Sequence, residues 1–466
     1  MIDLSFLANK RIAVLGLGRS GYNAARSLMA GKAVVMAWDD DAKRRETCAA
    51  GGMPIADPMG LDWSKMDMLV LSPGIPHRFP APHPVAQAAR DAGVPIVSDV
   101  ELLARARPDA TFIGITGTNG KSTTTSLIGH ILESAGCKVA VGGNLGTPAL
   151  TLPALGADGV YVLEMSSYQL EITPSPVFDV ALLLNISPDH LDRHGGMIGY
   201  IAAKRAIFHG ARTAIVGIDD EHSRAIRAAL AQGDGVKTIP VSGIDAAPGG
   251  VYVQAGQLID DMAGRAERVA DLGQARALPG VHNGQNAAAA YAAVRAIDLG
   301  RESAARGILT FPGLAHRQEL IATIRGVRYI NDSKATNADA TARALACYDT
   351  IYWIAGGVAK EGGIDSLGPL HPRIAHAFLI GAAAEPFGRT LEGHVPATQS
   401  GDLATAVRQA HAMAQQSSKK PAVVLLSPAC ASFDQFDNFE ARGEAFRTLV
   451  LGLNGDAEPH RGGAAA

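Results

Sequence analysis

The feature that most constrains the fold of this 466-residue chain is the alternation of short apolar runs with longer stretches of helical pattern. The runs include RIAVLGLG, TFIGITG and AVVLLSPA, and each is bounded by Gly, Pro or a polar residue. Unbroken apolar runs are typical of strands that are buried on both faces of a parallel sheet. We therefore expect an α/β fold whose strands are joined by right-handed helical crossovers.

The domain organisation follows from the length and from two restarts of this alternation. At roughly 150 residues per domain, the chain predicts about three domains. The pattern restarts after ARPDA near residue 108 and after FPGLAHR near residue 315. We expect domains at residues 1–108, 109–313 and 314–466, with a β-rich excursion between residues 240 and 280. The last residues, NGDAEPHRGGAAA, are expected to form a disordered tail.

Composition excludes several classes of protein. The 42 Lys and Arg residues against 45 Asp and Glu residues give a net charge of −3, so no basic field exists for nucleic acid or an anionic membrane. Apolar runs stay shorter than the roughly 18 residues of a membrane span. The cysteines are far apart and form no CxxC pair, which argues against a zinc ribbon or disulfide framework and suits a reducing cytoplasm.

A first glycine loop, GLGRSG at residues 16–21, follows a predicted strand and opens a predicted helix. Such a loop lets the backbone approach a pyrophosphate at a helix N-terminus. Asp39 lies near the end of the next strand, where a ribose-binding carboxylate is expected. Taken alone, the loop favours NAD or FAD; a UDP-sugar or a turn without a ligand are the alternatives.

A second glycine loop, TGTNGKST at residues 116–123, lies between the strand TFIGI and a helical run. It departs from the strict phosphate-loop pattern, because Ile115 stands where the first glycine is expected. Gly-Lys-Ser is intact, so Lys121 would reach the β- and γ-phosphates and the Ser122 hydroxyl would bind Mg²⁺. The residues expected to hold the nucleotide are Gly117, Thr118, Asn119, Gly120, Lys121, Ser122 and Thr123.

Polar residues follow the apolar strands of the predicted central domain: Thr116, Asn144, Glu164 and His190. Ligands of parallel α/β sheets bind beyond the carboxyl ends of the strands, so these residues predict a rim for Mg²⁺ and nucleotide. Glu164 is the oxygen ligand that Mg²⁺ prefers, whereas His190 could equally be a loop hydrogen bonder. Lys204, in GYIAAKRAIFHG, could touch phosphate as an ammonium but could not bind a metal.

Several longer motifs occur in a fixed order: TGTNGKST, EMSSYQLE, NISPDHLDRH, YIAAKRAIF, HNGQN, FPGLAHRQE, NDSKATN and LLSPACASFDQF. With them the chain resembles the Mur ligase family over nearly its whole length, and the last two resemble most closely the D-glutamate-adding members. The resemblance implies three domains: a Rossmann-like N-terminal domain, a P-loop-type central ATPase domain and a Rossmann-like C-terminal domain. It also implies a cytoplasmic, ATP- and Mg²⁺-dependent ligase of peptidoglycan precursor synthesis.

The resemblance assigns the first glycine loop to the nucleotide of UDP-N-acetylmuramoyl-L-alanine rather than to NAD. The implied contacts are Arg19, Ser20, Asp39, Ser72 and Gly74. The chain departs from the family at Asp40 and Asp41, whose extra carboxylates are expected to face ribose, uracil or solvent. Lys204 matches the lysine that the family carbamylates, a change that turns a cation into an anionic carbamate able to serve a metal site beside His190.

The remaining implied residues bind ATP and the amino acid. Asn283 and Asn286 would contact adenine and Asp332 the ribose, while Arg317 and Lys334 would reach the phosphates once the C-terminal domain closes. The implied amino-acid pocket comprises Thr336, Lys360, Ser432, Phe433 and Phe439. The other implied substrate contacts are Asn144, Ser166 and Gln169.

The expected reaction is a ligation in three steps, in which the substrate carboxylate accepts the γ-phosphate of ATP, the amine of D-glutamate attacks the acyl phosphate, and a tetrahedral intermediate loses phosphate. We expect a monomer that needs no protein nucleophile. Three alternatives stay open: a Mur ligase that adds another amino acid such as L-glutamate, an NAD-dependent dehydrogenase with a fused P-loop module, and a non-catalytic nucleotide-binding regulator.

Overall fold

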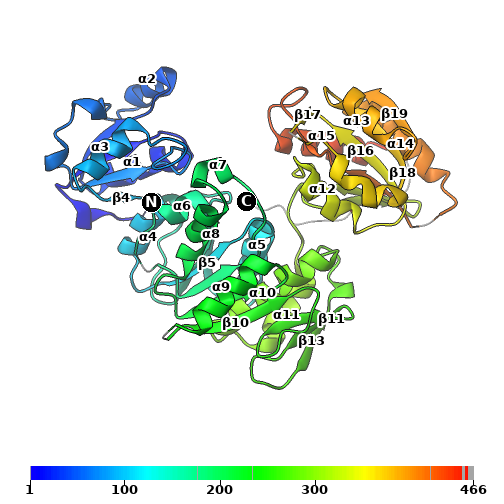
Figure 1. The fold of residues 1–466 in the computed structure, drawn as a ribbon, viewed down its shortest axis with the longest axis horizontal. Coiled ribbons are helices and arrows are strands. Elements are labelled where there is room, and N and C mark those ends of the chain that lie inside the picture. The colour runs from blue at the N-terminus through cyan, green and yellow to red at the C-terminus, as the bar shows by residue number, and fades with distance from the viewer. Residues whose placement is uncertain are drawn as a thin grey trace. The chain divides into compact units, whose positions relative to one another are not determined.

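The computed structural model describes residues 2–175, 177–233, 235–360, 362–419, 421–453 and 457–459. The chain divides into two compact units, the first being Met1–Gln274 with Asn283–Thr310 and the second Ala275–His282 with Phe311–Ala466. Both units contain parallel sheets with helices between the strands, so the expected α/β class is confirmed (Figure 1). The boundaries at residues 108 and 313 stay predictions.

The N-terminal part of the first unit is a parallel sheet with the strand order β2-β1-β3-β4. Its strands are β1 (Arg11–Leu15), β2 (Val34–Trp38), β3 (Met68–Leu71) and β4 (Ile96–Val97). Its helices are α1 (Arg19–Ala30), α2 (Ala42–Ala50), α3 (Pro84–Asp91) and α4 (Asp99–Ala106). The first glycine loop joins β1 to α1, which is the context that the sequence predicts.

The larger sheet of the first unit has the strand order β13-β12-β11-β10-β9-β8-β5-β7-β6. Its strands are β5 (Thr111–Thr116), β6 (Lys138–Gly143), β7 (Gly159–Glu164), β8 (Val180–Leu183), β9 (Thr213–Gly217), β10 (Lys237–Ser242), β11 (Val251–Gln254), β12 (Gln257–Asp260) and β13 (Glu267–Asp271). The neighbours from β6 to β11 are parallel, whereas β11, β12 and β13 pair antiparallel and confirm the β-rich excursion.

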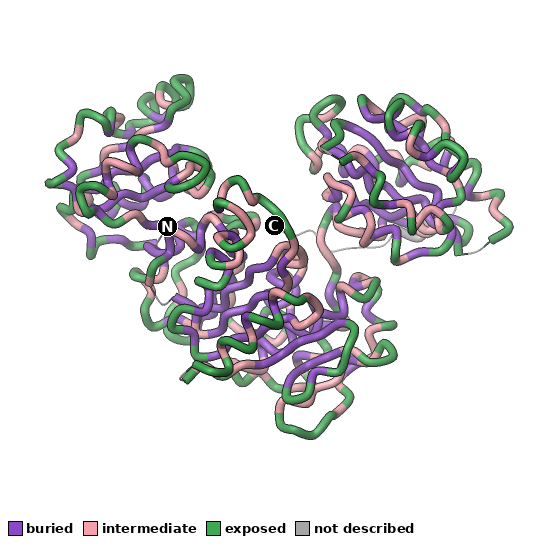
Figure 2. Tube along the Cα trace, in the orientation of Figure 1, coloured by how far each residue is buried: buried purple, intermediate pink, exposed green. Residues whose placement is uncertain are grey.

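The helices that follow in sequence are α5 (Lys121–Ser134), α6 (Ser167–Glu171), α7 (Leu191–His194), α8 (Met197–Arg205), α9 (Glu221–Ala231), α10 (Val281–Ala296) and α11 (Arg301–Thr310). Short 3₁₀ helices of the first unit lie at Ser5–Leu7, Pro58–Gly60, Trp63–Lys65, Ala149–Thr151, Ala206–Phe208 and Leu272–Gln274. Figure 2 shows the strands as buried and the outer turns as exposed.

Strand β5 is central to the larger sheet and places the second glycine loop. All residues of β5 except the first are buried, which matches the unbroken apolar run of its sequence. Its neighbours β7 and β8 run parallel to it, with Ile115 paired to Glu164. The carboxyl ends of these strands therefore lie at one edge of the sheet, and the glycine loop begins there.

The second unit has the strand order β19-β18-β16-β20-β15-β14-β22. Its elements are β14 (Glu319–Ile324), β15 (Val327–Asn331), α12 (Ala338–Leu345), β16 (Ile351–Gly356), β17 (Val358–Ala359), a 3₁₀ helix (Asp365–Arg373), β18 (Ile374–Ile380), α13 (Ala384–Leu391), β19 (Ala397–Gly401), α14 (Leu403–Gln415), β20 (Ala422–Leu426), β21 (Cys430–Ala431), α15 (Phe439–Leu451) and β22 (Ala457–Pro459). Strands β15, β20, β16, β18 and β19 are parallel.

The expected disordered tail lies mostly outside the described residues. Its described part, β22, pairs antiparallel with β14. A strand at the edge of a sheet offers unpaired backbone N–H and C=O groups to another segment, which gives these three residues a partner. The expectation of a disordered tail stays a prediction.

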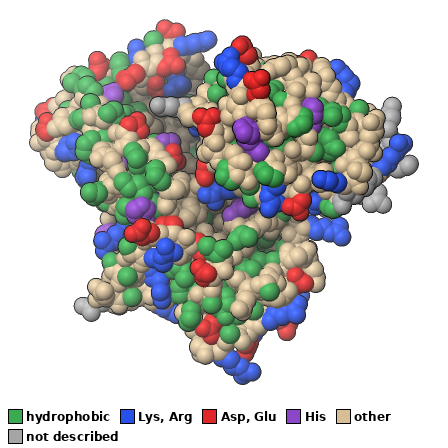
Figure 3. Space-filling view, turned by 45° about the vertical axis from the view of Figure 1, so that its right-hand side comes forward, with side chains coloured by type: hydrophobic (Ala, Val, Ile, Leu, Met, Phe, Trp, Pro, Cys, Tyr) green, Lys and Arg blue, Asp and Glu red, His purple; other side chains and the backbone are tan. Residues whose placement is uncertain are grey.

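On the face shown in Figure 3, Lys and Arg side chains are interspersed with Asp and Glu side chains. Within the described ranges, the structure contains no helix of the length and apolarity that crossing a membrane requires.

Candidate functional site

The second glycine loop closes tightly between β5 and α5. Gly120 caps α5 with φ of 84°, a left-handed conformation that favours glycine. A Cβ atom at this position would lie 2.3 Å from Asn286 Oδ1, so a larger residue would clash. The loop is also anchored from the neighbouring strand end, because the Asn119 N–H donates to Asn185 Oδ1 over 2.9 Å. The loop is thus preorganised at a helix N-terminus, where anions bind.

The Lys121 ammonium lies over the same loop. Its Nζ donates to the carbonyl oxygens of Gly117 and Thr118 over 2.9 and 2.8 Å. The next residue, Ser122, is buried in the first turn of α5. Lys121 and Ser122 therefore both lie at the second glycine loop, and their contacts with phosphate and Mg²⁺ stay predictions.

Glu164 is the last residue of β7 and lies beside the loop. Its buried carboxylate has a hydrogen-bond partner for only one of its two oxygens. The residue is 3% exposed, and its Oε1 accepts a hydrogen bond from Asn144 Nδ2 over 2.7 Å. Its Oε2 has no hydrogen-bond partner among the described residues. A buried carboxylate oxygen without a partner is costly, and a cation would relieve that cost. This oxygen fits the hard donor that Mg²⁺ requires.

Lys204 is a buried amine beside the same loop. The residue is 2% exposed, and its Nζ donates to Gly117 O over 2.8 Å and lies 4.8 Å from the Tyr200 ring centroid. Burial, assisted by the positive charge of Lys121, lowers the pKa of Lys204 well below its usual value. The environment therefore favours the neutral amine, which is the nucleophilic form.

His190 lies at the N-terminal end of α7 in a left-handed conformation, with φ of 51°. Its side chain is 53% exposed, and Nε2 is 3.5 Å from Asp189 Oδ2. Burial is the main cause that lowers the pKa of His190, and Lys121 contributes in the same direction. Within the described ranges no three His, Cys, Asp or Glu side chains gather as a metal cluster.

Four further predicted residues form hydrogen bonds within the protein. Ser166 and Gln169 form a reciprocal capping box at the start of α6. Asn286 accepts from Thr124 Oγ1 over 3.3 Å and donates to Asn283 Oδ1 over 2.9 Å. The structure thus brings Asn286 of α10 against the second glycine loop, with Asn283 hydrogen-bonded to it, and the contact of both residues with adenine stays a prediction.

The first glycine loop is held by residues that were predicted to bind nucleotide. Asp39 Oδ2 accepts from the Leu17 N–H over 2.6 Å, and Ser72 Oγ donates to Gly16 O over 2.9 Å. Burial acts to raise the pKa of Asp39, but hydrogen bonds from two backbone N–H groups and from Arg44 hold it below its usual value. Asp39 therefore stays ionised and shapes the loop.

The other residues of this region are open to solvent or half-buried. Arg19 is exposed and donates to Gly146 O over 2.6 Å, Ser20 is half-buried, and Gly74 is exposed. Of the two extra carboxylates, Asp41 caps α2 and Asp40 lies 3.0 Å from His83 Nε2. Both are largely exposed, and whether they face ribose, uracil or solvent stays a prediction.

The second unit holds the remaining predicted residues. Asp332 is buried, and burial raises its pKa to about 7. Its carboxylate accepts hydrogen bonds from Ser427 Oγ over 2.8 Å and from the Gln318 N–H over 3.1 Å. Lys334 Nζ lies 3.8 Å from the Phe439 ring centroid. The others differ in exposure: Ser432 is buried, Thr336 and Arg317 are half-buried, Lys360 is exposed, and Phe433 is 74% exposed. Their joint role with the first unit stays a prediction.

Two residues of the site escape the sequence analysis. Asn185 holds the glycine loop through Asn119, and the Tyr200 hydroxyl lies 3.0 Å from Thr118 Oγ1. The rule that selected Asn144 and Glu164 would have found Asn185, because it closely follows β8. Tyr200 is four residues before Lys204, a spacing that places two side chains on one helix face.

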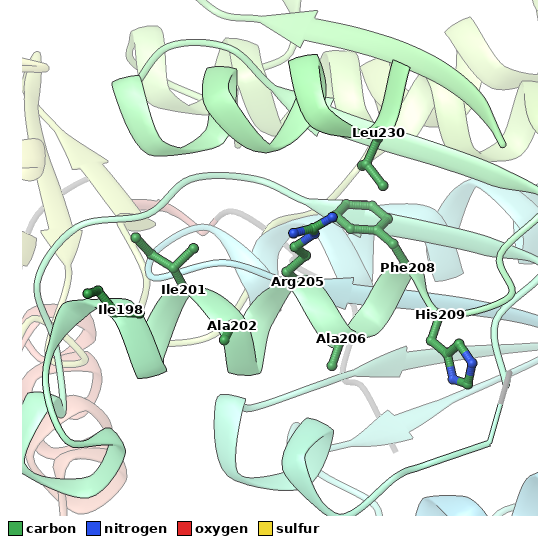
Figure 4. A pocket seen from close by; sticks show the side chains of 8 residues that line it. All are labelled: Ile198, Ile201, Ala202, Arg205, Ala206, Phe208, His209 and Leu230. Atoms are coloured by element: carbon green, nitrogen blue, oxygen red, sulfur yellow. The ribbon is translucent and has the colours of Figure 1, made fainter. Parts of the chain in front are cut away.

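A separate hollow of about 560 Å³ lies along α8 (Figure 4). Its wall is mostly apolar and consists of Ile198, Ile201, Ala202, Arg205, Ala206, Phe208, His209 and Leu230. No predicted site residue lines it. Lys204 on the same helix is buried and contacts Gly117, so α8 contributes to two separate environments.

Comparisons with known proteins identify one family. A family model described as the Mur ligase middle domain matches residues 115–294. The UDP-N-acetylmuramoylalanine–D-glutamate ligase of Rhodospirillum rubrum is 54% identical over 461 residues, covering 97% of both chains. The protein of the same name from Caulobacter vibrioides is 53% identical over 462 residues, covering 97% of this chain and 98% of that one.

Two solved structures share the fold at low identity. A pseudomurein peptide ligase type C from Methanothermus fervidus matches with a TM-score of 0.56 and 17% identity, covering 96% of this chain and 100% of that one. The UDP-N-acetylmuramate–alanine ligase of Thermotoga maritima matches with a TM-score of 0.57 and 15% identity, covering 95% of this chain and 99% of that one. At these identities the likeness concerns the fold alone.

Proposed function

The chain belongs to the Mur ligase family, and we propose that it joins D-glutamate to UDP-N-acetylmuramoyl-L-alanine with ATP and Mg²⁺. The observation that carries the proposal is 54% identity to a D-glutamate ligase over 97% of both chains. The geometry supports it, because a phosphate loop, an ammonium and a half-satisfied carboxylate meet at one sheet edge. The L-glutamate alternative differs only in the amino-acid pocket.

The chemistry needs positioning and charge neutralisation rather than a protein nucleophile. A carboxylate oxygen of the nucleotide-sugar attacks the γ-phosphorus, ADP leaves, and an acyl phosphate forms. The amine of D-glutamate then attacks the acyl carbon, and the tetrahedral intermediate expels phosphate and loses a proton. Lys121 and the backbone N–H groups of its loop hold the phosphates. Mg²⁺, when bound, offsets phosphate charge, and Ser122, Glu164 and His190 would hold it.

Lys204 is proposed to act as a carbamate. The neutral amine attacks CO₂, a C–N bond forms, and one proton is released. Burial supports this step, because it lowers the pKa of Lys204 and so shifts the amine toward its neutral form. The product is an anion beside the loop that Lys204 contacts through Gly117, and it removes the repulsion that an ammonium would exert on Mg²⁺.

The remaining substrate contacts follow the family resemblance. The first glycine loop, with Arg19, Ser20, Asp39, Ser72 and Gly74, would receive the nucleotide, and Asn144, Ser166 and Gln169 the muramoyl end. Lys360 would pair with one carboxylate of D-glutamate, and Thr336, Ser432, Phe433 and Phe439 would complete that pocket. We propose that the protein acts as a monomer in the cytoplasm, where this precursor chemistry takes place.

A phosphate-release assay tests the function. We expect phosphate only when UDP-N-acetylmuramoyl-L-alanine, ATP, Mg²⁺ and D-glutamate are all present, with L-glutamate inactive in its place. Product mass identifies the new peptide bond. Equal rates with both enantiomers would overturn the specificity, and phosphate release without the nucleotide-sugar would overturn the ligase assignment.

Replacing Glu164 tests the metal site. We expect Glu164→Gln to raise the Mg²⁺ concentration for half-maximal activity about tenfold or more, because the change removes one charge from a metal ligand. The amide oxygen can still accept from Asn144, so the fold should persist. The matched control is Glu133→Gln, an exposed residue at the far end of α5. Unchanged Mg²⁺ dependence in Glu164→Gln would remove this residue from the metal site.

A further inference from the structure

One set of contacts in the first unit has no role in the function proposed above. It joins the segment after β3, residues 72–80, to α7 and Gly195. We call residues 72–80 the β3 loop and residues 190–195 the α7 turn. The β3 loop contains Ser72 and Gly74, which we assign to the nucleotide-sugar, and the α7 turn begins with His190, which we assign to the metal.

Arg193 makes the most direct of these contacts. Its NH1 donates to Gly74 O over 2.9 Å, and its guanidinium carbon lies 4.7 Å from the Tyr168 ring centroid. The Tyr168 ring is in turn 5.3 Å from the His190 ring. Arg193 is therefore connected on one side to the β3 loop and on the other, through Tyr168, to His190.

A buried polar chain runs beside it. His194 is almost fully buried, with Nδ1 3.0 Å from Glu171 Oε1 and Nε2 2.9 Å from Ser167 Oγ. The second oxygen of Glu171 lies 3.7 Å from Nδ1 of His77, a buried residue of the β3 loop. Both ring nitrogens of His194 are thus occupied, so its ring holds the end of α7 against α6.

Phe79 makes a third contact between the two segments. A Cβ atom on Gly195 would lie 2.9 Å from Phe79 Cζ, so the ring packs directly on the glycine that follows α7. Helix α7 has only four residues, which is too short to be stable by itself. The position of His190 at its start therefore depends on contacts with surrounding segments, and the β3 loop supplies several of them.

We propose that Arg193 is a positioning residue that couples nucleotide-sugar binding at the β3 loop to the placement of His190. The inference rests on the proposed function, since it assigns the two ends of the connection to that substrate and to Mg²⁺. A ligand that fixes the backbone conformation at Gly74 also fixes the position of the Gly74 carbonyl oxygen. The hydrogen bond from Arg193 to this oxygen then restrains the α7 turn. Because coupling between two binding sites is reciprocal, Mg²⁺ and nucleotide should tighten nucleotide-sugar binding in return.

Calorimetry on the full chain measures this coupling. The affinity for UDP-N-acetylmuramoyl-L-alanine is determined with and without Mg²⁺ and a non-hydrolysable ATP analogue. We expect Mg²⁺ and the analogue together to tighten binding about fivefold or more in the unmodified protein, within the usual range of coupling. In Arg193→Ala the ratio of the two affinities should fall to about one.

Two variants and one control separate coupling from a general loss of structure. Arg193→Lys keeps the charge but loses the planar group that stacks and donates, so it should also lose most of the coupling. Phe79→Ala removes the Gly195 contact from a ring that is partly exposed, and should reduce the ratio even if Arg193→Ala fails to fold. Arg78→Ala removes an exposed cation of the same loop and should keep the ratio of the unmodified protein.

The outcomes distinguish this inference from the proposed function. A ratio near one in the unmodified protein, or a full ratio in Arg193→Lys and Phe79→Ala, overturns the coupling while the ligase assignment stands. Failure of the unmodified protein to bind the nucleotide-sugar at all overturns the proposed function instead.

Discussion

Replacing Lys121 by Ala is expected to lower kcat for phosphate release by about a thousandfold or more, without a change in folding. Transfer of a phosphoryl group is catalysed by positioning and by neutralising charge, and single cations in such sites act on about this scale. In the structure the Lys121 ammonium lies at the loop and donates hydrogen bonds to the carbonyl oxygens of Gly117 and Thr118.

Steady-state kinetics with saturating ATP and nucleotide-sugar measures this effect, and circular dichroism with thermal unfolding reports the fold. The matched control is Lys138→Ala, which removes a largely exposed lysine at the start of β6, where it pairs with Asp158. The control should keep its rate within about twofold, since an exposed ion pair contributes little to stability. A near-normal rate in Lys121→Ala would refute the role of Lys121 in phosphate binding.

Replacing Lys204 by Arg is expected to lower activity by a similar factor, even though the positive charge is kept. The guanidinium keeps its proton at all working pH values and cannot become a carbamate. It would therefore present a cation beside Glu164 where we propose an anion. The matched control is Lys237→Arg, which makes the same change at an exposed position at the start of β10 and should leave the rate unchanged.

Because Lys204 is buried, a second measurement keeps the test independent of folding. The unmodified protein should lose activity after removal of dissolved CO₂ and regain it with bicarbonate, and its native mass should exceed the sequence mass by one CO₂. Lys204→Arg should respond to neither treatment. Full activity of a protein whose mass shows the bare amine would reject the carbamate.

The comparisons confirm the family that the sequence motifs indicated. The relatives match 97% of the chain at over 50% identity, which makes a dehydrogenase with a fused P-loop module untenable. The first glycine loop shows why the motif alone favoured a dinucleotide. Its strand–turn–helix geometry is shared by all such sites, and the fold records no preference between one pyrophosphate ligand and another.

The individual site assignments stay predictions, although the structure gives several of them a physical basis. Glu164 has an unsatisfied buried oxygen, whereas Asp39, Ser166 and Gln169 use their hydrogen-bonding groups to hold protein segments. The latter three could position a substrate indirectly through the loops and caps they stabilise. The sequence did not separate these two kinds of residue, because both lie at the ends of strands or at the starts of helices.

The sequence by itself determined the α/β class, both glycine loops and the edge of the sheet at which Thr116, Asn144 and Glu164 gather. These features depend on local periodicity and on the rule that parallel strands end at one edge, so they can be read along the chain. Tertiary structure alone decided that Lys204 is buried with a lowered pKa, that one oxygen of Glu164 has no hydrogen-bond partner among the described residues, and that Arg193 connects α7 to the β3 loop. Each of these depends on packing between segments far apart in the chain, where burial and the exclusion of water set the charge and the available partners.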